Sequence, residues 1–219
     1  MSVSAWLQKV ARDPISGLSH LAGALTGFGG LIYLLLQTIP TGEPRRIAAA
    51  LVFGISLVLL YLASAAYHLL HVSEGAQVVL RRIDHALIFT LIAGTYTPFC
   101  LVTMANSWGT ELLMTIWSIA IFGLGLSLFW IGAPRWLTTA LYLFMGWFIV
   151  LALPAMKALP PVAMFWLIVG GGCYTLGAVI YALKWPNPYP PHFGFHEIWH
   201  LFVLGGSTSH FLSVATVLS

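Results

Sequence analysis

Long apolar stretches alternate with short polar or proline-rich segments along the chain. Each stretch is close to the ~20 residues that an α-helix needs to cross the hydrocarbon core of a bilayer. Seven such spans are expected, at residues 16–38, 46–70, 83–104, 108–131, 136–157, 160–183 and 195–218. The pattern therefore predicts an all-α membrane protein, namely a bundle of seven transmembrane helices.

Turn-forming residues separate several of these spans. Residues 40–44 read Pro-Thr-Gly-Glu-Pro, and residues 185–191 read Trp-Pro-Asn-Pro-Tyr-Pro-Pro. Proline and glycine in such density interrupt a helix. The first 14 residues are mixed polar and fit either a short amphipathic helix at the membrane surface or a partly ordered tail. We therefore divide the chain into an N-terminal segment, residues 1–14, and a seven-span domain, residues 15–219.

Composition indicates that the solvent of this chain is lipid. Hydrophobic residues make up 59% of the 219 residues and charged residues 7%, whereas soluble domains carry about 25% charged residues. A chain so poor in charge cannot cover a water-facing surface, so we expect it to be integral to a lipid bilayer. The formal net charge is +3, but no block of lysine and arginine is long enough to follow a phosphate backbone. Nucleic-acid binding is therefore not expected, and no oligomeric state follows from the sequence.

Lysine and arginine are distributed unevenly between the two predicted sides of the membrane. Six lie on the side of the N-terminus: Lys9, Arg12, Arg81, Arg82, Arg135 and Lys184. Three lie on the other side: Arg45, Arg46 and Lys157. Because cytoplasmic loops carry an excess of these residues, the N-terminus is predicted to be cytoplasmic and the C-terminus to lie outside.

Two histidines lie four residues apart at the start of the last predicted span. On a helix His196 and His200 would share one face, one turn apart, and could bind one metal ion. With Glu197 they also spell H-E-x-x-H, the signature of many zinc metalloproteases. Those enzymes need a third ligand in a water-filled cleft, and their extended motif has a histidine where this chain has Gly206. Glu197 could instead be an acid that faces the lipid headgroups.

Further polar residues are predicted at the depth of this histidine pair. Ser64 and His68 lie at the cytoplasmic end of the second span, and Asp84 lies in the first turn of the third. Ionisable groups cost roughly 2.5–3.5 kcal/mol or more at the bilayer centre and are functional by default. Three neutral histidines plus an open position form the pattern of a catalytic zinc site. We therefore predict a metal site formed by His68 and the pair in the last span.

Several of these residues also have a purely structural explanation. The helix macrodipole favours an acid such as Asp84 in a first helical turn, and Ser64 could bond the backbone of its own helix. His71 is the strongest competing ligand, because it lies three residues from His68. The histidines expected to lie outside the site are His20, His85, His192 and His210.

The chain resembles the haemolysin III-like branch of the progestin and adipoQ receptor (PAQR) membrane proteins over residues 15–219. The resemblance rests on Ser64-Ala65-Ala66-Tyr67-His68, Arg82-Ile83-Asp84-His85-Ala86, Ala93-Gly94-Thr95-Tyr96-Thr97-Pro98-Phe99, His196-Glu197-Ile198-Trp199-His200 and Gly205-Gly206-Ser207. It implies seven spans with the N-terminus inside and Zn²⁺ bound by His68, His196 and His200. It also implies that Asp84 contacts the water on the zinc and that Ser64 lies just behind. Glu197 is not part of the family pattern.

The resemblance implies more than one function. The family is similar to the alkaline ceramidases, which implies a zinc-dependent hydrolase of a lipid amide or ester near the cytoplasmic leaflet. A receptor or regulator of membrane lipid homeostasis with structural zinc is the first alternative. The name of the bacterial branch implies a haemolysin-like pore former as the second. In each case the setting is a bacterial plasma (inner) membrane, with a membrane lipid as substrate or ligand, and the sequence leaves all three open.

The uneven distribution of lysine and arginine generates a test of orientation. A reporter enzyme that is active only outside the cytoplasm, fused after Ser219, is expected to be active. The same reporter fused before residue 1 is expected to be silent. Activity of the N-terminal fusion alone would reverse the orientation and move the predicted metal site to the outer side of the membrane.

Overall fold

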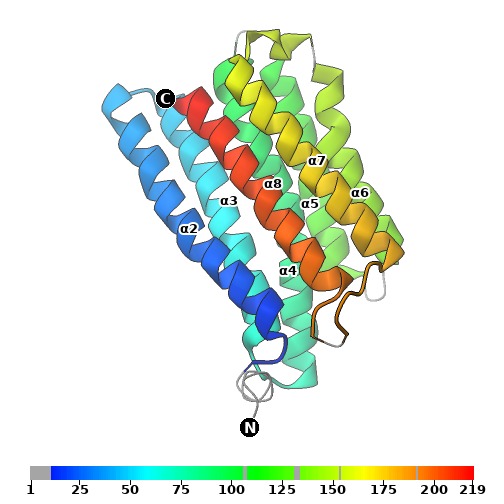
Figure 1. Ribbon diagram of the computed structural model, residues 1–219. Coiled ribbons are helices and arrows are strands. Elements are labelled where there is room, and N and C mark those ends of the chain that lie inside the picture. Colours follow the sequence, from blue (N-terminus) through cyan, green and yellow to red (C-terminus); the bar gives the residue numbers. More distant parts are fainter. Residues whose placement is uncertain (1–10, 106–107, 131–133, 153, 191) are drawn as a thin grey trace.

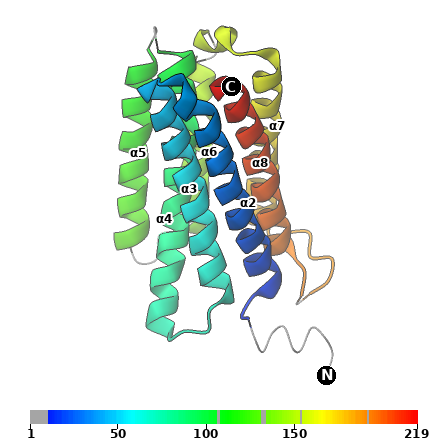
Figure 2. The same cartoon turned by 90° about the vertical axis from the view of Figure 1, so that its left-hand side faces the viewer.

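The structure is a computed structural model that describes residues 11–105, 108–130, 134–152, 154–190 and 192–219. Over these ranges nearly all residues are helical, and the long helices pack side by side in one bundle (Figures 1 and 2). The predicted all-α membrane fold is therefore confirmed. The amphipathic helix considered for the N-terminal segment falls mostly on residues 1–10, outside the described part of the chain.

Within the described ranges the α-helices carry the labels of Figure 1. They are α2 (Pro14–Thr38), α3 (Pro44–Leu69), α4 (Glu74–Pro98), α5 (Gly109–Phe129), α6 (Arg135–Trp147), α7 (Pro161–Leu183) and α8 (Phe195–Leu218). Six of them, all except α6, are long and apolar enough to cross a membrane. These six spans bear out the assignment to a membrane. That α6 also crosses the membrane, and which side the N-terminus faces, stay predictions.

Helix α4 begins nine residues earlier than the predicted start at residue 83. Ser73 caps it, because the Ser73 hydroxyl accepts a hydrogen bond from the backbone N–H of Ala76 at 3.4 Å. Serine at this position and Glu74 in the first turn are favourable signals for a helix start. The expectation that Asp84 lies in the first turn was therefore wrong. Asp84 lies in the interior of α4, where the macrodipole does not explain a carboxylate.

Helix α6 is shorter than the predicted span at residues 136–157. Its regular turns end at Trp147, and the chain continues as a 3₁₀ helix, Phe148–Ala152. A buried tyrosine of α4 stabilises this end: the Tyr96 hydroxyl donates to the carbonyl of Met145 at 2.7 Å and accepts from the N–H of Ile149 at 2.8 Å. Tyr96 thus satisfies backbone groups that the end of an α-helix leaves unpaired.

The start of α2, the end of α3 and the start of α8 lie at the same end of the bundle (Figure 1). Helix α2 packs against α3 and α8, and glycine lets the helices approach closely. A Cβ at Gly23 of α2 would lie 2.8 Å from Leu204 of α8 and 3.2 Å from Tyr61 of α3. Small residues at such contacts are the usual basis of helix packing in membranes. The fold therefore brings three helix termini together around one region.

A second close approach, between α3 and α4, gives a test of this packing. A Cβ at Gly94 would meet the Ser56 hydroxyl and lie 2.9 Å from the Ser56 Cβ, which cannot rotate away. We expect Gly94→Ala to cost about 1–3 kcal/mol through overpacking, or about 2–4 °C in melting temperature per kcal/mol. The matched control is Gly29→Ala in α2, where a Cβ would have no neighbour within 4 Å among the described residues outside its own helix. The melting temperature of Gly29→Ala should match or exceed that of the wild type, since alanine favours helix. Equal melting temperatures for the two variants would contradict the close packing at Gly94.

Candidate metal centre

Three histidines from two helices meet at the end of the bundle where α3 ends and α8 begins. His68 lies in the last turn of α3, and His196 and His200 lie in the first two turns of α8. One candidate ligand atom from each of the three lies within 4.8 Å of the other two. The ring centroid of His68 is 5.2 Å from that of His196 and 4.8 Å from that of His200. The structure thus brings together the three residues that the sequence predicts as ligands.

The nitrogen atoms of this cluster suit a shared cation. The Nε2 atoms of His196 and His200 are 3.2 Å apart, so these two lone-pair positions face one region of space. The rings of His68 and His200 are buried, at 2% and 3% exposure, which separates them from water. Zinc is commonly bound by neutral imidazole nitrogens, and three such ligands leave a fourth position open. The donor set therefore fits a zinc-type metal ion.

Asp84 and Ser64 lie beside the histidine cluster. The Asp84 carboxyl group is buried in α4, where it faces the Ser64 side chain and interacts electrostatically with His68. Among the described residues, the group close enough to hold one metal ion consists of the three histidines and does not include Asp84. Asp84 is therefore a neighbour of the histidine cluster and not a member of it.

His20 of α2 also belongs to this region, contrary to the expectation that it lies outside. Its ring packs on His200 with centroids 3.9 Å apart and against the edge of Tyr61 at 4.9 Å. Neither ring nitrogen of His20 has a hydrogen-bond partner among the described residues. Sequence reasoning missed His20, although its position near the cytoplasmic end of the first span placed it at the depth of the other histidines.

Asp13, which precedes α2, contacts the histidine cluster from outside the span. Its Oδ2 lies 3.2 Å from Nδ1 of His68. This hydrogen bond, helped by the nearby Arg12 guanidinium, holds the pKa of Asp13 below its ordinary value, although partial burial opposes the shift. Asp13 is therefore an anion at neutral pH. The sequence predicts no role for Asp13, which belongs to the N-terminal segment.

Glu197 has a structural function at the start of α8. Its Oε2 accepts a hydrogen bond from the backbone N–H of Gly194 at 2.8 Å, which caps the helix. Its Oε1 accepts from the Ser16 hydroxyl of α2 at 3.2 Å. Both carboxylate oxygens are thus engaged in holding α8 in place. This arrangement differs from the catalytic glutamate of a zinc protease, so the H-E-x-x-H spelling is incidental.

The remaining histidines are separated from the cluster. His71, the competing ligand, is exposed and is not part of the three-histidine group. The ring of His192 packs on Tyr189. His85 and His210, expected to lie outside the site, line the cavity described next. Of these two, His210 lies ten residues beyond His200 on α8, which is nearly three helical turns, so the prediction that it is too far to be a ligand agrees with its position.

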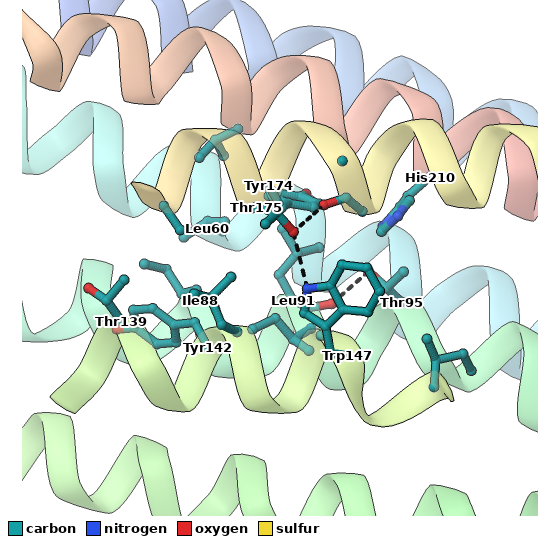
Figure 3. A pocket seen from close by; sticks show the side chains of 18 of the residues that line it. Leu60, Ile88, Leu91, Thr95, Thr139, Tyr142, Trp147, Tyr174, Thr175 and His210 are labelled. Carbon is teal, nitrogen blue, oxygen red and sulfur yellow. Dashed lines mark hydrogen bonds between the residues drawn. The ribbon is translucent and has the colours of Figure 1, made fainter. Parts of the chain in front are cut away.

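An elongated, mostly apolar cavity of about 330 Å³ extends from the histidine cluster into the bundle. At its polar end it is lined by His20, Ser64, Asp84, His196 and His200. From there it follows α4 to Phe99, the residue just after the end of that helix, and α8 as far as His210, a run of roughly 20 Å at 1.5 Å per residue. Figure 3 shows Trp147 of α6 beside this cavity, where its indole N–H donates to the Thr175 hydroxyl of α7 at 3.1 Å. The volume of the cavity lies within the range of small-molecule binding sites.

Known proteins are similar to this chain over nearly its whole length. A family model described as haemolysin-III related matches residues 8–211. A protein of Bacillus subtilis (strain 168) named Hemolysin-3 homolog is 35% identical over 206 residues, which cover 94% of this chain and 93% of that protein. Hemolysin-3 of Bacillus cereus is 35% identical over 209 residues, with 94% and 92% covered.

The histidine cluster generates a prediction of metal content. The purified protein is expected to carry about one metal ion per chain, and His200→Ala should lose most of it because one of three ligands is removed. The matched control, His71→Ala, should keep the metal, since this exposed side chain lies outside the cluster. Elemental analysis of folded protein measures both. Loss of metal in His71→Ala with retention in His68→Ala would show that the wrong histidine was chosen.

Proposed function

We propose, since the chain belongs to the haemolysin III-related family, that it is a zinc-dependent membrane hydrolase that cleaves an amide or ester bond of a lipid. The observation that carries the proposal is that the polar residues of the candidate site and a set of apolar residues line one cavity. Two of the three clustered histidines, Asp84 and Ser64 line the polar end of a cavity that is otherwise mostly apolar. A lipid with a polar linkage and an acyl chain is divided in the same way into a polar part and an apolar part.

His68, His196 and His200 would hold the zinc ion. When bound, zinc would supply Lewis acidity, which polarises a carbonyl group and lowers the pKa of water to about 7. The burial of the cluster supports this role, because electrostatic interactions strengthen where water is excluded. Three protein ligands also leave a position for substrate or water, as in catalytic rather than structural zinc sites.

Asp84 would accept the proton of the attacking water. Its carboxyl group lies next to the cluster without belonging to it, as expected of a general base rather than a ligand. Ser64 faces Asp84 and would orient its carboxylate, because a hydroxyl can donate to an oxygen of that group. Both residues line the cavity, so both would face the bond to be cleaved.

The cavity would hold the acyl part of the lipid. Its lining between the polar end and His210 includes Leu60, Ile88 and Leu91, three of the residues labelled in Figure 3. Apolar side chains suit an alkyl chain, because they give it surroundings as apolar as the lipid tails that it leaves. With the N-terminus in the cytoplasm, the polar end would lie near the cytoplasmic leaflet, and the lipid would enter from there.

Replacement of Asp84 separates an enzyme from a regulator with structural zinc. Asp84→Asn keeps the size of the side chain and removes its basicity. We expect the variant to fold and to retain zinc while hydrolysis of a lipid amide or ester falls by at least ~10²-fold. The assay is a lipid screen by mass spectrometry, with zinc content and melting temperature measured on the same samples. Glu74→Gln, an exposed carboxylate at the start of the same helix, is the matched control.

A regulator would give a different pattern. If Asp84 closed the coordination of a structural metal, Asp84→Asn would weaken zinc binding and thermal stability together. The wild type would hydrolyse no lipid in the screen. This outcome would replace the hydrolase with a receptor or regulator in which a lipid in the cavity changes the packing of the helices.

A further inference from the structure

We propose that Asp13 is a positioning residue for the metal centre: it fixes the ring of His68 so that Nε2 of this histidine faces the metal. The inference rests on the proposed function only in that a metal ion is bound. It does not require hydrolysis. It assigns a role to a residue just before α2 that lies outside the sequence motifs on which the resemblance rests.

The backbone of Asp13 is fixed to the end of α3. Its N–H donates to the carbonyl of His68 at 2.8 Å, and its own carbonyl accepts from the N–H of Gly17 at 3.0 Å. These two bonds attach the first turn of α2 to the last turn of α3. The carboxylate of Asp13 is therefore held at a defined distance from the imidazole.

The side chain of Asp13 is not used for the usual purpose of an aspartate at this position. Asp13 is the N-cap residue of α2, where an aspartate commonly accepts a hydrogen bond from its own helix. No such side-chain cap is present in this helix. The carboxylate instead points to His68, with Oδ2 at 3.2 Å from Nδ1. The contact with the histidine thus takes precedence over the cap.

Arg12 holds the carboxylate from the other side. Its Nε and Nη2 atoms both lie 3.2 Å from the same Oδ2 of Asp13. The guanidinium carbon lies 4.9 Å above the ring of Tyr67, and Tyr67 packs against His68 with centroids 4.6 Å apart. Asp13 is therefore enclosed between a cation and the histidine, and the four side chains form one closed arrangement.

The chemistry of a carboxylate determines the tautomer of His68. An ionised carboxylate only accepts hydrogen bonds, so Nδ1 of His68 must carry the proton that it donates. The lone pair is then on Nε2, which is free to bind a metal ion. In carboxylate–histidine–metal arrangements the carboxylate fixes the ring orientation and raises the basicity of the ligand, and its loss typically lowers metal affinity 10–100-fold.

The test measures metal affinity of the full-length protein in detergent by competition with a chromogenic zinc chelator. We expect Asp13→Asn to lower the affinity for Zn²⁺ about 10-fold, because a neutral amide accepts more weakly, and Asp13→Ala to lower it by up to about 100-fold. Asp13→Glu should restore part of the loss. Glu43→Gln is the matched control, since Glu43 is an exposed carboxylate paired with Arg46 at the start of α3, and it should leave the affinity unchanged.

Two further readouts separate positioning from simple attachment of α2. The visible spectrum of the Co²⁺-loaded protein should change in Asp13→Asn, because the ligand field of His68 changes. The melting temperature in excess chelator should match that of the wild type, because the backbone bonds of Asp13 remain. Affinity within about threefold of wild type and an unaltered Co²⁺ spectrum would overturn the proposal, whether or not the melting temperature falls.

The result is distinguishable from failure of the proposed function. A wild type that binds zinc and hydrolyses no lipid would remove the hydrolase and leave the role of Asp13 to be decided by the affinities. A wild type that binds neither Zn²⁺ nor Co²⁺ would overturn both.

Discussion

Imidazole and carboxylate groups buried at one end of an apolar bundle have to find partners within the protein. An unpaired polar group in such surroundings costs several kcal/mol, and the bilayer offers no water to replace the lost hydrogen bonds. The structure meets this constraint by pairing. His68 contacts Asp13, Asp84 faces Ser64, and the two histidines of α8 face each other. Every pair that joins two helices also fixes the position of those helices.

The same constraint explains why the ends of α2, α3 and α8 surround the histidine cluster, although Asp84 comes from the interior of α4. Backbone groups at a helix end lack partners within the helix, so side chains that cap the end and side chains that build the site lie close together. Glu197 illustrates this: it caps α8 through Gly194 and attaches α8 to α2 through Ser16. Two histidines depart from this pairing, since both ring nitrogens of His20 and Nδ1 of His200 have no hydrogen-bond partner in the described part of the chain. The ring of His20 is held instead by packing on His200 and Tyr61.

The sequence predicted those parts of the site that depend on spacing within one helix. The interval of four residues placed His196 beside His200, and a common depth brought His68, Ser64 and Asp84 to the same level as this pair. It did not predict Asp13 or His20, because hydropathy locates a residue along a span but not which helices are neighbours. The predicted start of α4 and the predicted end of α6 were wrong for a related reason. The start of α4 depends on the Ser73 cap in a polar stretch, and the end of α6 depends on Tyr96 from another helix.

The position of the site in the chain has a consequence for how it forms during synthesis. His68 and His196 are more than half the chain length apart, so they meet only when a long loop has closed. Helices α2 and α3 emerge early and can pack on each other before α8 exists, which would set the Asp13 carboxylate against the His68 ring in advance. The remaining two histidines arrive with α8, after the other described helices. When α8 leaves the ribosome and docks on the helices made before it, it would therefore bring the three histidines together in one step.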